Sequence, residues 1–217
     1  MMTLLSYALC ATGLVRTENQ DNLYVNGIYR SDISDNSVFR HSGKTSKNGL
    51  YAIADGMGGE KHGELASLIT VQTMSAVKSS GGCLSMVQYL IDRNKDICDI
   101  MSTQGGIRIG STFAGICING KNAHIVNIGD SRVYLFRGST LSLLSRDHTS
   151  VQQMVDMGMI SKEEARQHSM RHQLTQHLGI YPAEMIIEPY TYSIKIEHSD
   201  VFLRKTVLMT GKSAAIP

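Results

Sequence analysis

Residues 50–64 read Leu50-Tyr51-Ala52-Ile53-Ala54-Asp55-Gly56-Met57-Gly58-Gly59-Glu60-Lys61-His62-Gly63-Glu64. The apolar run 50–54 contains residue types that suit a pleated, covered surface, so we predict a short buried strand. Asp55 then places a carboxylate at the strand end, and glycines follow where backbone must turn sharply or approach a ligand. Asp55 and the carbonyl of Gly56 have the oxygen chemistry of a hard-cation site. Taken alone, however, an Asp-Gly pair more often marks a tight strand-to-helix turn.

Length and composition predict one globular domain spanning residues 1–217, since 217 residues suffice for a single substantial core. The net charge of +2 and the 18% of charged residues give no sign of a nucleic-acid-binding surface. The four cysteines are widely spaced without a Cys-x-x-Cys pair, which predicts core residues in a reducing compartment. No apolar run approaches the roughly 20 residues that span a bilayer, and the N-terminal run lacks a basic flank. We therefore expect a cytoplasmic, monomeric protein that binds neither membrane nor nucleic acid.

The first half of the chain predicts two strands, a loop and two helices. Strands are expected at residues 3–11 and 22–28, and helices at 64–77 and 84–101, where apolar residues recur at helical spacing. The polar stretch 30–48 shows little periodicity and is predicted to be a solvated loop. Its basic side chains offer attraction to an acidic partner as the alternative: Arg30, Arg40, His41, Lys44 and Lys47.

The second half is dominated by short strands. They are predicted at residues 111–118, 123–129, 132–137, 141–144, 186–196 and 201–203. Two short helices are predicted between them, at 150–158 and 161–168, the second opened by a capping box of Ser161 and Glu164. Tight hairpin signals without a βαβ rhythm indicate an α+β fold of antiparallel sheets with helices packed outside.

Polar clusters occupy the ends of four predicted strands, where side chains distant in sequence can converge. They are residues 16–21 (Arg-Thr-Glu-Asn-Gln-Asp), 55–59 (Asp-Gly-Met-Gly-Gly), 110–112 (Gly-Ser-Thr) and 129–132 (Gly-Asp-Ser-Arg), the last followed by Asp-His-Thr at 147–149. Each cluster alone is ordinary turn or strand-entry chemistry. The order and combination of the four carry more information than any one of them.

Together these clusters resemble the PPM family of metal-dependent Ser/Thr protein phosphatases, also called protein phosphatase 2C, and its bacterial branch in particular. That family reads Arg-x-x-Asn-Gln-Asp, Asp-Gly-Met-Gly-Gly-x-x-x-Gly-Glu-x-Ala-Ser, Gly-[Ser/Thr]-Thr and Gly-Asp-Ser-Arg. This chain has all four patterns, and the resemblance covers about residues 3–203. The second pattern, which includes Gly63, Glu64, Ala66 and Ser67, is the most specific.

The resemblance implies a fold, a reaction and a set of site residues. The implied fold is a four-layer αββα sandwich of two antiparallel sheets flanked by helix pairs. The implied reaction is hydrolysis of phosphoserine and phosphothreonine by water activated on two Mn²⁺ or Mg²⁺ ions. By this resemblance Asp55 bridges the metals, the Gly56 carbonyl binds one, Asp21 holds a metal-bound water and Arg16 clamps the phosphate. Asp130 contributes to a third ion or, alternatively, only caps a turn.

The resemblance also places an insert and names partners. Residues of about 146–180 correspond to the family's flap, beside the active site. His148 and the other histidines of the insert are expected to be solvated or satisfied in packing. Met57 stands where other members carry a histidine, so protonation of the leaving group is assigned to water, and His62 is expected to be a loop residue near a helix start. The implied partners are phosphorylated proteins, with a cognate Ser/Thr kinase or its substrates among them.

The C-terminal sequence departs from the family pattern, which has two further aspartates there. Residues 200–203 match the expected strand, but Met209-Thr210-Gly211 stands where a Ser/Thr-Asp-Gly motif belongs, and no acid follows Asp200. A C-terminally shortened sandwich is therefore expected. Three explanations stay open: a truncated or frameshifted product, a natural pseudophosphatase, or ligands supplied from elsewhere. The alternative function is a catalytically impaired protein that binds phosphoprotein or kinase.

Overall fold

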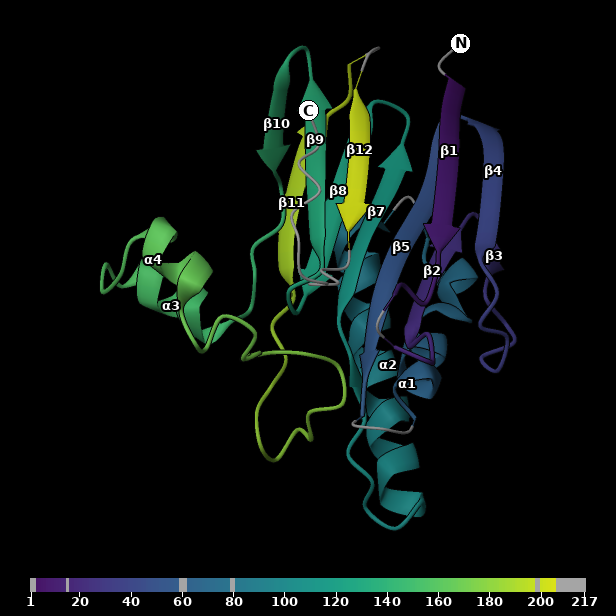
Figure 1. Cartoon of the computed structure of the whole chain (residues 1–217). Coiled ribbons are helices and arrows are strands. Elements are labelled where there is room, and N and C mark those ends of the chain that lie inside the picture. The colour runs from purple at the N-terminus through teal and green to yellow at the C-terminus, as the bar shows by residue number, and fades with distance from the viewer. Residues whose placement is uncertain (1–2, 15, 59–61, 79–80, 198–199, 206–217) are drawn as a thin grey trace.

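The computed structural model describes residues 3–14, 16–58, 62–78, 81–197 and 200–205. Its centre is an antiparallel sheet with the strand order β11–β8–β7–β5–β2–β3, with β6 paired to the end of β5 (Figure 1). The strands of this sheet are β2 (Asp21–Val25), β3 (Ile28–Tyr29), β5 (Asn48–Met57), β6 (Gly110–Ser111), β7 (Phe113–Asn119), β8 (Asn122–Ile128) and β11 (Tyr190–Lys195). The predicted buried strand before Asp55 is thus the middle of the sheet.

Two helices cover one face of this sheet. They are α1 (Gly63–Val71) and α2 (Gly82–Thr103), joined through a short 3₁₀ turn at Met74–Ala76. Met86, Leu90 and Ile97 of α2 are fully buried against apolar side chains of the sheet, in one continuous core. The apolar stripes predicted from sequence are therefore core faces, as their helical spacing indicated. The first helix ends at Val71, earlier than predicted.

Two smaller antiparallel sheets pack on the opposite face. One pairs β1 (Thr3–Cys10) with β4 (Phe39–Ser46), and the other has the order β10–β9–β12, from Thr140–Leu143, Arg132–Arg137 and Val201–Lys205. They share a second core with the large sheet, in which Val133 and Leu135 of β9 meet Ile116 of β7. The α+β class and the antiparallel pairing are confirmed.

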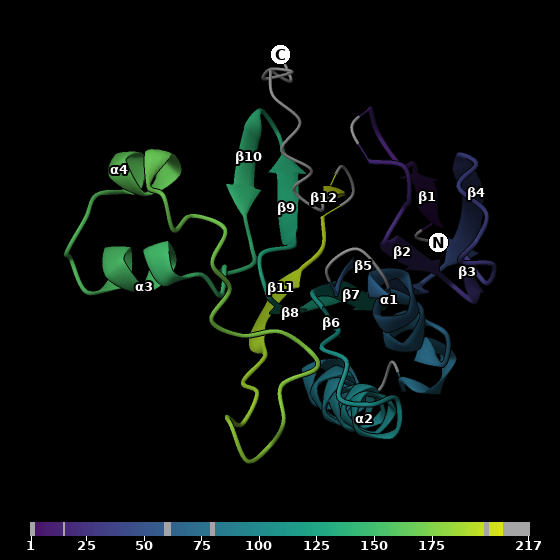
Figure 2. The same cartoon turned by 60° about the horizontal axis from the view of Figure 1, so that its bottom comes forward.

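The predicted four layers are represented by three in the described residues. The remaining helices, α3 (Ser150–Asp156) and α4 (Lys162–Gln167), stand beside the sheets and cover neither small sheet (Figures 1 and 2). Outward-facing side chains on these sheets are accordingly exposed, with Tyr7 at 83% and Leu141 at 50%. The α+β class with antiparallel sheets is what the described residues show, and the second flanking helix pair stays a prediction.

The first half of the chain holds two corrections. Residues 39–46, expected to be loop, form β4, which pairs antiparallel with β1 and has half-buried residues at alternate positions. The strand expected at 22–28 is a hairpin instead, because Asn26 and Gly27 both take positive φ, at 48° and 100°. Asn-Gly is the pair that a two-residue type I′ turn favours.

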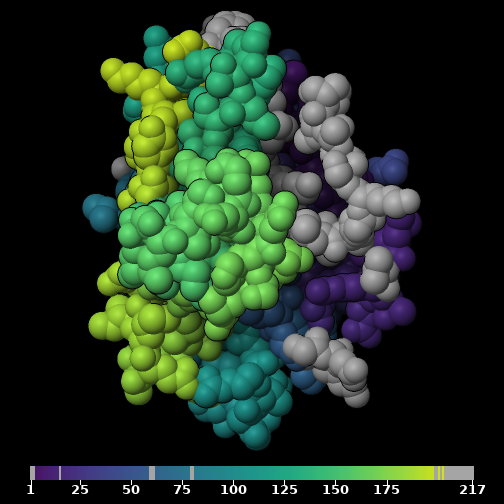
Figure 3. Space-filling view, turned by 60° about the vertical axis from the view of Figure 1, so that its left-hand side comes forward, coloured from purple at the N-terminus to yellow at the C-terminus, as the bar shows by residue number. Residues whose placement is uncertain are grey.

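The insert folds as predicted. Thr149 caps α3, and Ser161 with Glu164 forms the predicted capping box at α4. In Figure 3 this green segment stands forward on the face of the molecule. Of the helices in the described residues, none is both long and apolar enough to span a bilayer.

Candidate active site

The site is built on two carboxylates at neighbouring strand ends. In the pairing of β2 with β5, Asp21 lies directly opposite Asp55. Burial is the largest cause that raises the pKa of both carboxyls, and the charges of Asp21 and Asp130 add to it at Asp55, whose pKa rises to about 8. The interaction between the two carboxyls also adds to the raised pKa of Asp55 and opposes the rise in the pKa of Asp21. The sequence prediction that the first two clusters converge is confirmed.

Arg16 lies at the edge of this acid pair. Its exposed guanidinium donates from Nη1 to Gln20 Oε1 at 3.2 Å, and its charge lowers the pKa of both Asp21 and Asp55. One of its five N–H donors is used in that bond, and a guanidinium fork matches two phosphate oxygens. The position suits the phosphate-binding role expected of it.

Arg30 was expected in a solvated loop and is buried instead, at 5% exposure. Its Nη1 donates to the backbone carbonyl of Asp21 at 2.6 Å and its Nη2 to that of Asp35 at 2.8 Å. Asn19 Oδ1 accepts from the Asp21 N–H at 3.0 Å. Both polar groups of the Asp21 backbone are thus held by side chains, which fixes the position of its carboxylate. Asn19 stood in a recognised motif, whereas nothing in the pattern around Arg30 signalled its burial.

The environment of Gly56 explains why a glycine follows Asp55. Its N–H donates to the carbonyl of Gln20 at 3.1 Å, and a Cβ placed on it would lie 1.9 Å from the carbonyl oxygen of Gly63. The end of β5 and the start of α1 therefore touch backbone to backbone, which only glycine permits. His62 precedes the helix with φ of 80°, which confirms it as a loop residue at a helix start.

Thr112 and Ser131 connect the second, third and fourth clusters. Asp55 and Thr112 exchange two hydrogen bonds: the Asp55 N–H donates to Thr112 Oγ1 at 3.2 Å, and the Thr112 N–H donates to the Asp55 carbonyl at 2.9 Å. The Thr112 and Ser131 hydroxyls are 2.7 Å apart. Sequence reasoning assigned these hydroxyls no role, although both lie inside the motifs that it singled out.

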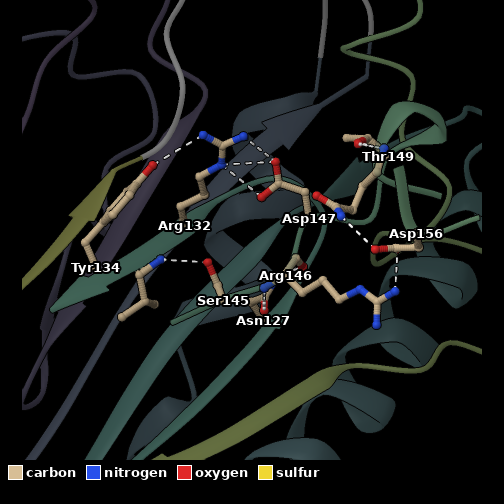
Figure 4. A network of polar contacts seen from close by, with 10 residues as sticks. Asn127, Arg132, Tyr134, Ser145, Arg146, Asp147, Thr149 and Asp156 are labelled. Carbon is tan, nitrogen blue, oxygen red and sulfur yellow. Dashed lines mark hydrogen bonds and ion pairs between the residues drawn. The ribbon is translucent and has the colours of Figure 1, made fainter. Parts of the chain in front are cut away.

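A polar network ties the fourth cluster to the insert (Figure 4). Arg132 donates from Nε to Asp147 Oδ1 at 2.9 Å and from Nη2 to Oδ2 at 2.5 Å, and from Nη1 to the Tyr134 hydroxyl at 3.3 Å. These bonds with Asp147 are the main cause of the raised pKa of Arg132. Arg146, next along the chain, forms an ion pair with Asp156 of α3. The start of the insert is therefore anchored beside the acid pair.

His148 contacts the fourth cluster, which also contains Asp130. The Gly129 N–H donates to His148 Nδ1 at 3.1 Å, and burial lowers the pKa of His148, so the imidazole is neutral and satisfied in packing, as expected. Burial is also the first cause that raises the pKa of Asp130, followed by the charge of Asp147. Asp130 in turn contributes to the raised pKa of Asp55.

The donor chemistry of the acid pair fits a divalent cation. Two half-buried carboxyls that face each other are a costly arrangement, and a hard cation with oxygen ligands relieves it. Within the described ranges, no group of three or more His, Cys, Asp or Glu side chains is placed to hold a metal. Asp200 forms an ion pair with Arg137 at 2.6 Å, away from the acid pair, as expected for an acid that precedes its strand. The departure at residues 209–211 lies outside the described residues.

Comparisons with known proteins find related sequences and structures. A family model described as Protein phosphatase 2C matches residues 14–153. A putative protein phosphatase 2C-type of Streptococcus pyogenes serotype M6 is 31% identical over 158 residues, covering 67% of this chain and 64% of that protein. The serine/threonine protein phosphatase PstP of Mycobacterium tuberculosis is 30% identical over 164 residues, covering 73% of this chain and 28% of that protein. The chain thus spans less than two thirds of either relative.

A solved structure is similar over most of the chain. The crystal structure of the catalytic domain of serine/threonine protein phosphatase PstP, in complex with two manganese ions, superposes with a TM-score of 0.69 at 28% sequence identity. The match covers 94% of this chain and 77% of that one.

Proposed function

The chain belongs to the protein phosphatase 2C family, and from that premise we propose that it is a metal-dependent protein serine/threonine phosphatase. The observation that carries the proposal is the pair of Asp21 and Asp55 in register at neighbouring strand ends, with Arg16 beside it. This pair is a strained carboxyl couple in the protein alone, and it suits binding of a divalent cation.

In this proposal Asp21, Asp55 and the carbonyl of Gly56 hold two Mn²⁺ or Mg²⁺ ions. When bound, the ions lower the pKa of water and offset the negative charge of the phosphate. Asp55 gives up its proton to solvent as it becomes a ligand. Asp130 serves a third ion, and the alternative is that it only caps its turn.

The other side chains orient the substrate. Arg16 binds two oxygens of the phosphate, which fixes the phosphorus against the acid pair. Arg30, Asn19 and Thr112 hold the backbone of the two acids, so their carboxylates are positioned before any ligand arrives. Water protonates the leaving serine or threonine oxygen, because Met57 occupies the position where a histidine would serve.

The proposal is tested by hydrolysis of p-nitrophenyl phosphate and a phosphothreonine peptide, with Mn²⁺ added or chelated. We expect turnover that needs the metal and disappears in Asp55→Ala. The matched control is Asp92→Ala, which removes an exposed carboxylate on α2 and leaves turnover unchanged. Metal-independent turnover, or full activity in Asp55→Ala, would contradict the proposal.

The alternative function is a catalytically impaired protein that binds phosphoprotein or a kinase. The observation that favours it is the small donor set, since the described residues bring together only the Asp21–Asp55 pair and no larger ligand group. A folded sample that binds the phosphothreonine peptide without turnover supports this alternative. Partner binding should then survive Asp55→Ala, whereas loss of the partner in that variant counts against it.

Partners and location are also proposals. Phosphorylated proteins, including a cognate Ser/Thr kinase or its substrates, are the partners that the family assignment favours. The near-neutral charge of +2 supports a protein that binds neither nucleic acid nor membrane. We place it in the cytoplasm as a monomer.

A further inference from the structure

A pocket of about 320 Å³ lies at the end of β5, the strand that carries Asp55. Its walls come from the end of β5, from the strand segment around β6 and from the last part of the insert. The lining residues are Met57, Gly58, Arg108, Ile109, Gly110, His177, Gly179, Ile180 and Glu184. The volume is at the lower end of the range for small ligand sites, which suits one or two amino-acid side chains.

Met57 connects the pocket to Asp55, because both residues lie on β5. Met57 follows Asp55 by two positions on β5, so both side chains lie on the same face of the strand, about 7 Å apart along it. Met57 also pairs across the ladder with Gly110, which forms the adjacent wall. An extended peptide advances about 3.4 Å per residue. A peptide whose phosphoresidue meets Asp55 therefore presents a residue one or two positions away to this pocket.

The walls are pre-formed by buried backbone contacts. Asn94 of α2, 5% exposed, accepts from the Gly179 and Ile180 N–H groups at 2.7 and 3.2 Å and donates to the Ile180 carbonyl at 2.9 Å. A Cβ on Gly179 would lie 2.3 Å from the carbonyl oxygen of Ile109. The Ser111 N–H donates to the Leu178 carbonyl at 3.1 Å. The segment that closes the pocket is thus fixed to both α2 and β6.

The chemistry of the lining favours an apolar occupant. Met57, Ile109 and Ile180 supply the apolar surface. At the rim, Arg108 donates two hydrogen bonds to Glu184 at 3.1 and 2.6 Å, so the two charges cancel. The guanidinium of Arg108 also stacks on Tyr181, 5.2 Å from the ring centroid. A charged side chain in the pocket would find no net opposite charge and would lose its hydration.

His177 makes a backbone contact in the pocket wall. Its Nδ1 lies 2.8 Å from the carbonyl oxygen of Leu178, and a carbonyl only accepts, so Nδ1 carries a proton. The pocket therefore combines an apolar lining with a rim of matched polar groups.

We propose that this pocket is a specificity subsite that takes an apolar side chain one or two residues from the phosphoresidue of a peptide substrate. The subsite rests on the proposed function, because it assumes that the phosphoresidue meets the acid pair. It makes substrate choice depend on residues 177–184 of the chain.

The test uses thiophosphothreonine peptides, which are hydrolysed slowly, with Leu, Ala or Glu placed in turn at each position from −2 to +2. Binding is measured by fluorescence anisotropy in the presence of Mn²⁺. At one position we expect the Leu peptide to bind about tenfold tighter than the Ala peptide, from the apolar area that Leu buries. The Glu peptide should bind no better than the Ala peptide.

Two variants make the test specific to the pocket. Ile180→Ala should reduce the Leu-to-Ala ratio to about twofold, since it removes apolar lining. Glu184→Arg places two arginines at an exposed rim and should make the Glu peptide the preferred ligand. Glu163→Ala, on the exposed surface of α4, is the control and should preserve the ratio of the unaltered protein.

The outcomes separate the subsite from the proposed function. Equal binding of Leu and Ala peptides at all positions, or unchanged ratios in both pocket variants, would overturn the subsite. Hydrolysis of p-nitrophenyl phosphate, measured on the same samples, reports on the proposed function alone. Discrimination without hydrolysis would support the subsite and favour the binding alternative, and failure to bind any peptide would overturn both.

Discussion

The carboxylates of Asp147 and Asp55 have opposite electrostatic environments. Asp147 is buried opposite Arg132, which gives it three hydrogen bonds between 2.5 and 3.0 Å. Asp55 is half-buried opposite another acid, Asp21, and its pKa rises to about 8. The first arrangement is complete within the protein, and the second gains most from an added cation. Burial of an acid therefore does not identify a ligand site, whereas burial of an acid against another acid points to one.

The largest expected difference between Asp55 and Asp147 is in their contribution to metal affinity. Asp55→Asn should weaken Mn²⁺ binding at least about 100-fold, equivalent to about 3 kcal/mol, because a neutral amide is a poor substitute for an anionic ligand. Asp147→Asn should change the affinity less than about threefold. Isothermal titration calorimetry measures both. Similar losses of Mn²⁺ affinity in the two variants would contradict the proposed difference between Asp55 and Asp147.

The next largest effect is on the free energy of unfolding and concerns the ion pair between Arg132 and Asp147. Arg132→Met leaves the Asp147 carboxylate buried without its partner and should cost about 2–3 kcal/mol, reduced from the fully buried case because Arg132 is partly exposed. The double variant Arg132→Met/Asp147→Leu should recover part of that loss. Urea denaturation of the wild type, both single variants and the double variant completes the cycle. Simple additivity of the two losses would show that the pair is not coupled.

A smaller effect on the free energy of unfolding tests the hydrogen bonds that join Asp55 through Thr112 to Ser131. Thr112→Val removes the hydroxyl that accepts from the Asp55 N–H and contacts Ser131, which should cost about 1–2 kcal/mol. Thr191→Val, at an exposed position of β11, is the matched control, with an expected change within about 0.5 kcal/mol. Equal unfolding free energies for the two variants would mean that the hydroxyl bridge contributes nothing.

The smallest effect is a pH dependence of the metal-free protein. The pKa of Asp55 in the folded state, about 8, is above the ordinary value of a carboxyl, so the folded chain holds a proton that the unfolded chain lacks. Stability from this proton is complete below about pH 4 and is lost as pH rises through 8. Between pH 7 and 9 the loss should be about 1 kcal/mol.

The comparison variant for this pH dependence is Asp55→Asn, studied in chelator by thermal or urea unfolding. It removes the Asp55 contribution and leaves the raised pKa of buried thiols such as Cys10 in both proteins. The difference between the two pH profiles isolates the carboxyl. Parallel profiles would show that Asp55 is ionised at neutral pH without metal.

Much of the fold was predictable because its elements carry strong local signals. The apolar spacing of α2, the Ser161–Glu164 capping box and the β-rich segments 113–119 and 122–128 all formed as predicted. The strand β4 was missed because its inward positions include His41 and Gly43, which give no apolar alternation. Its pairing with β1 supplies a partner that the local sequence does not announce.

The acid pair was predictable from motifs, but its supports were not. Asp21 and Asp55 stood at predicted strand ends, so their meeting followed from sheet geometry. Arg30 looked like one more basic residue of a polar loop, and only tertiary structure buries it under Asp21. Asn94 similarly sat in an apolar stripe, with no sign that it would hold residues 179 and 180. Polar groups that satisfy distant backbone leave no periodic trace in sequence.

The backbone contact between Gly56 and Gly63 has a consequence for mutational scans. Every missense change at Gly56 adds a Cβ where the Gly63 carbonyl oxygen is 1.9 Å away, so each is expected to lower the yield of folded protein. A growth-based selection will therefore score Gly56 as intolerant on account of folding alone, even though its carbonyl is a proposed ligand. Asp55→Asn preserves the shape of the side chain and removes its negative charge. The growth score of this variant, divided by the abundance of its folded protein, therefore reports the loss of activity rather than the loss of folding. Fitness maps of this chain gain their meaning from that ratio.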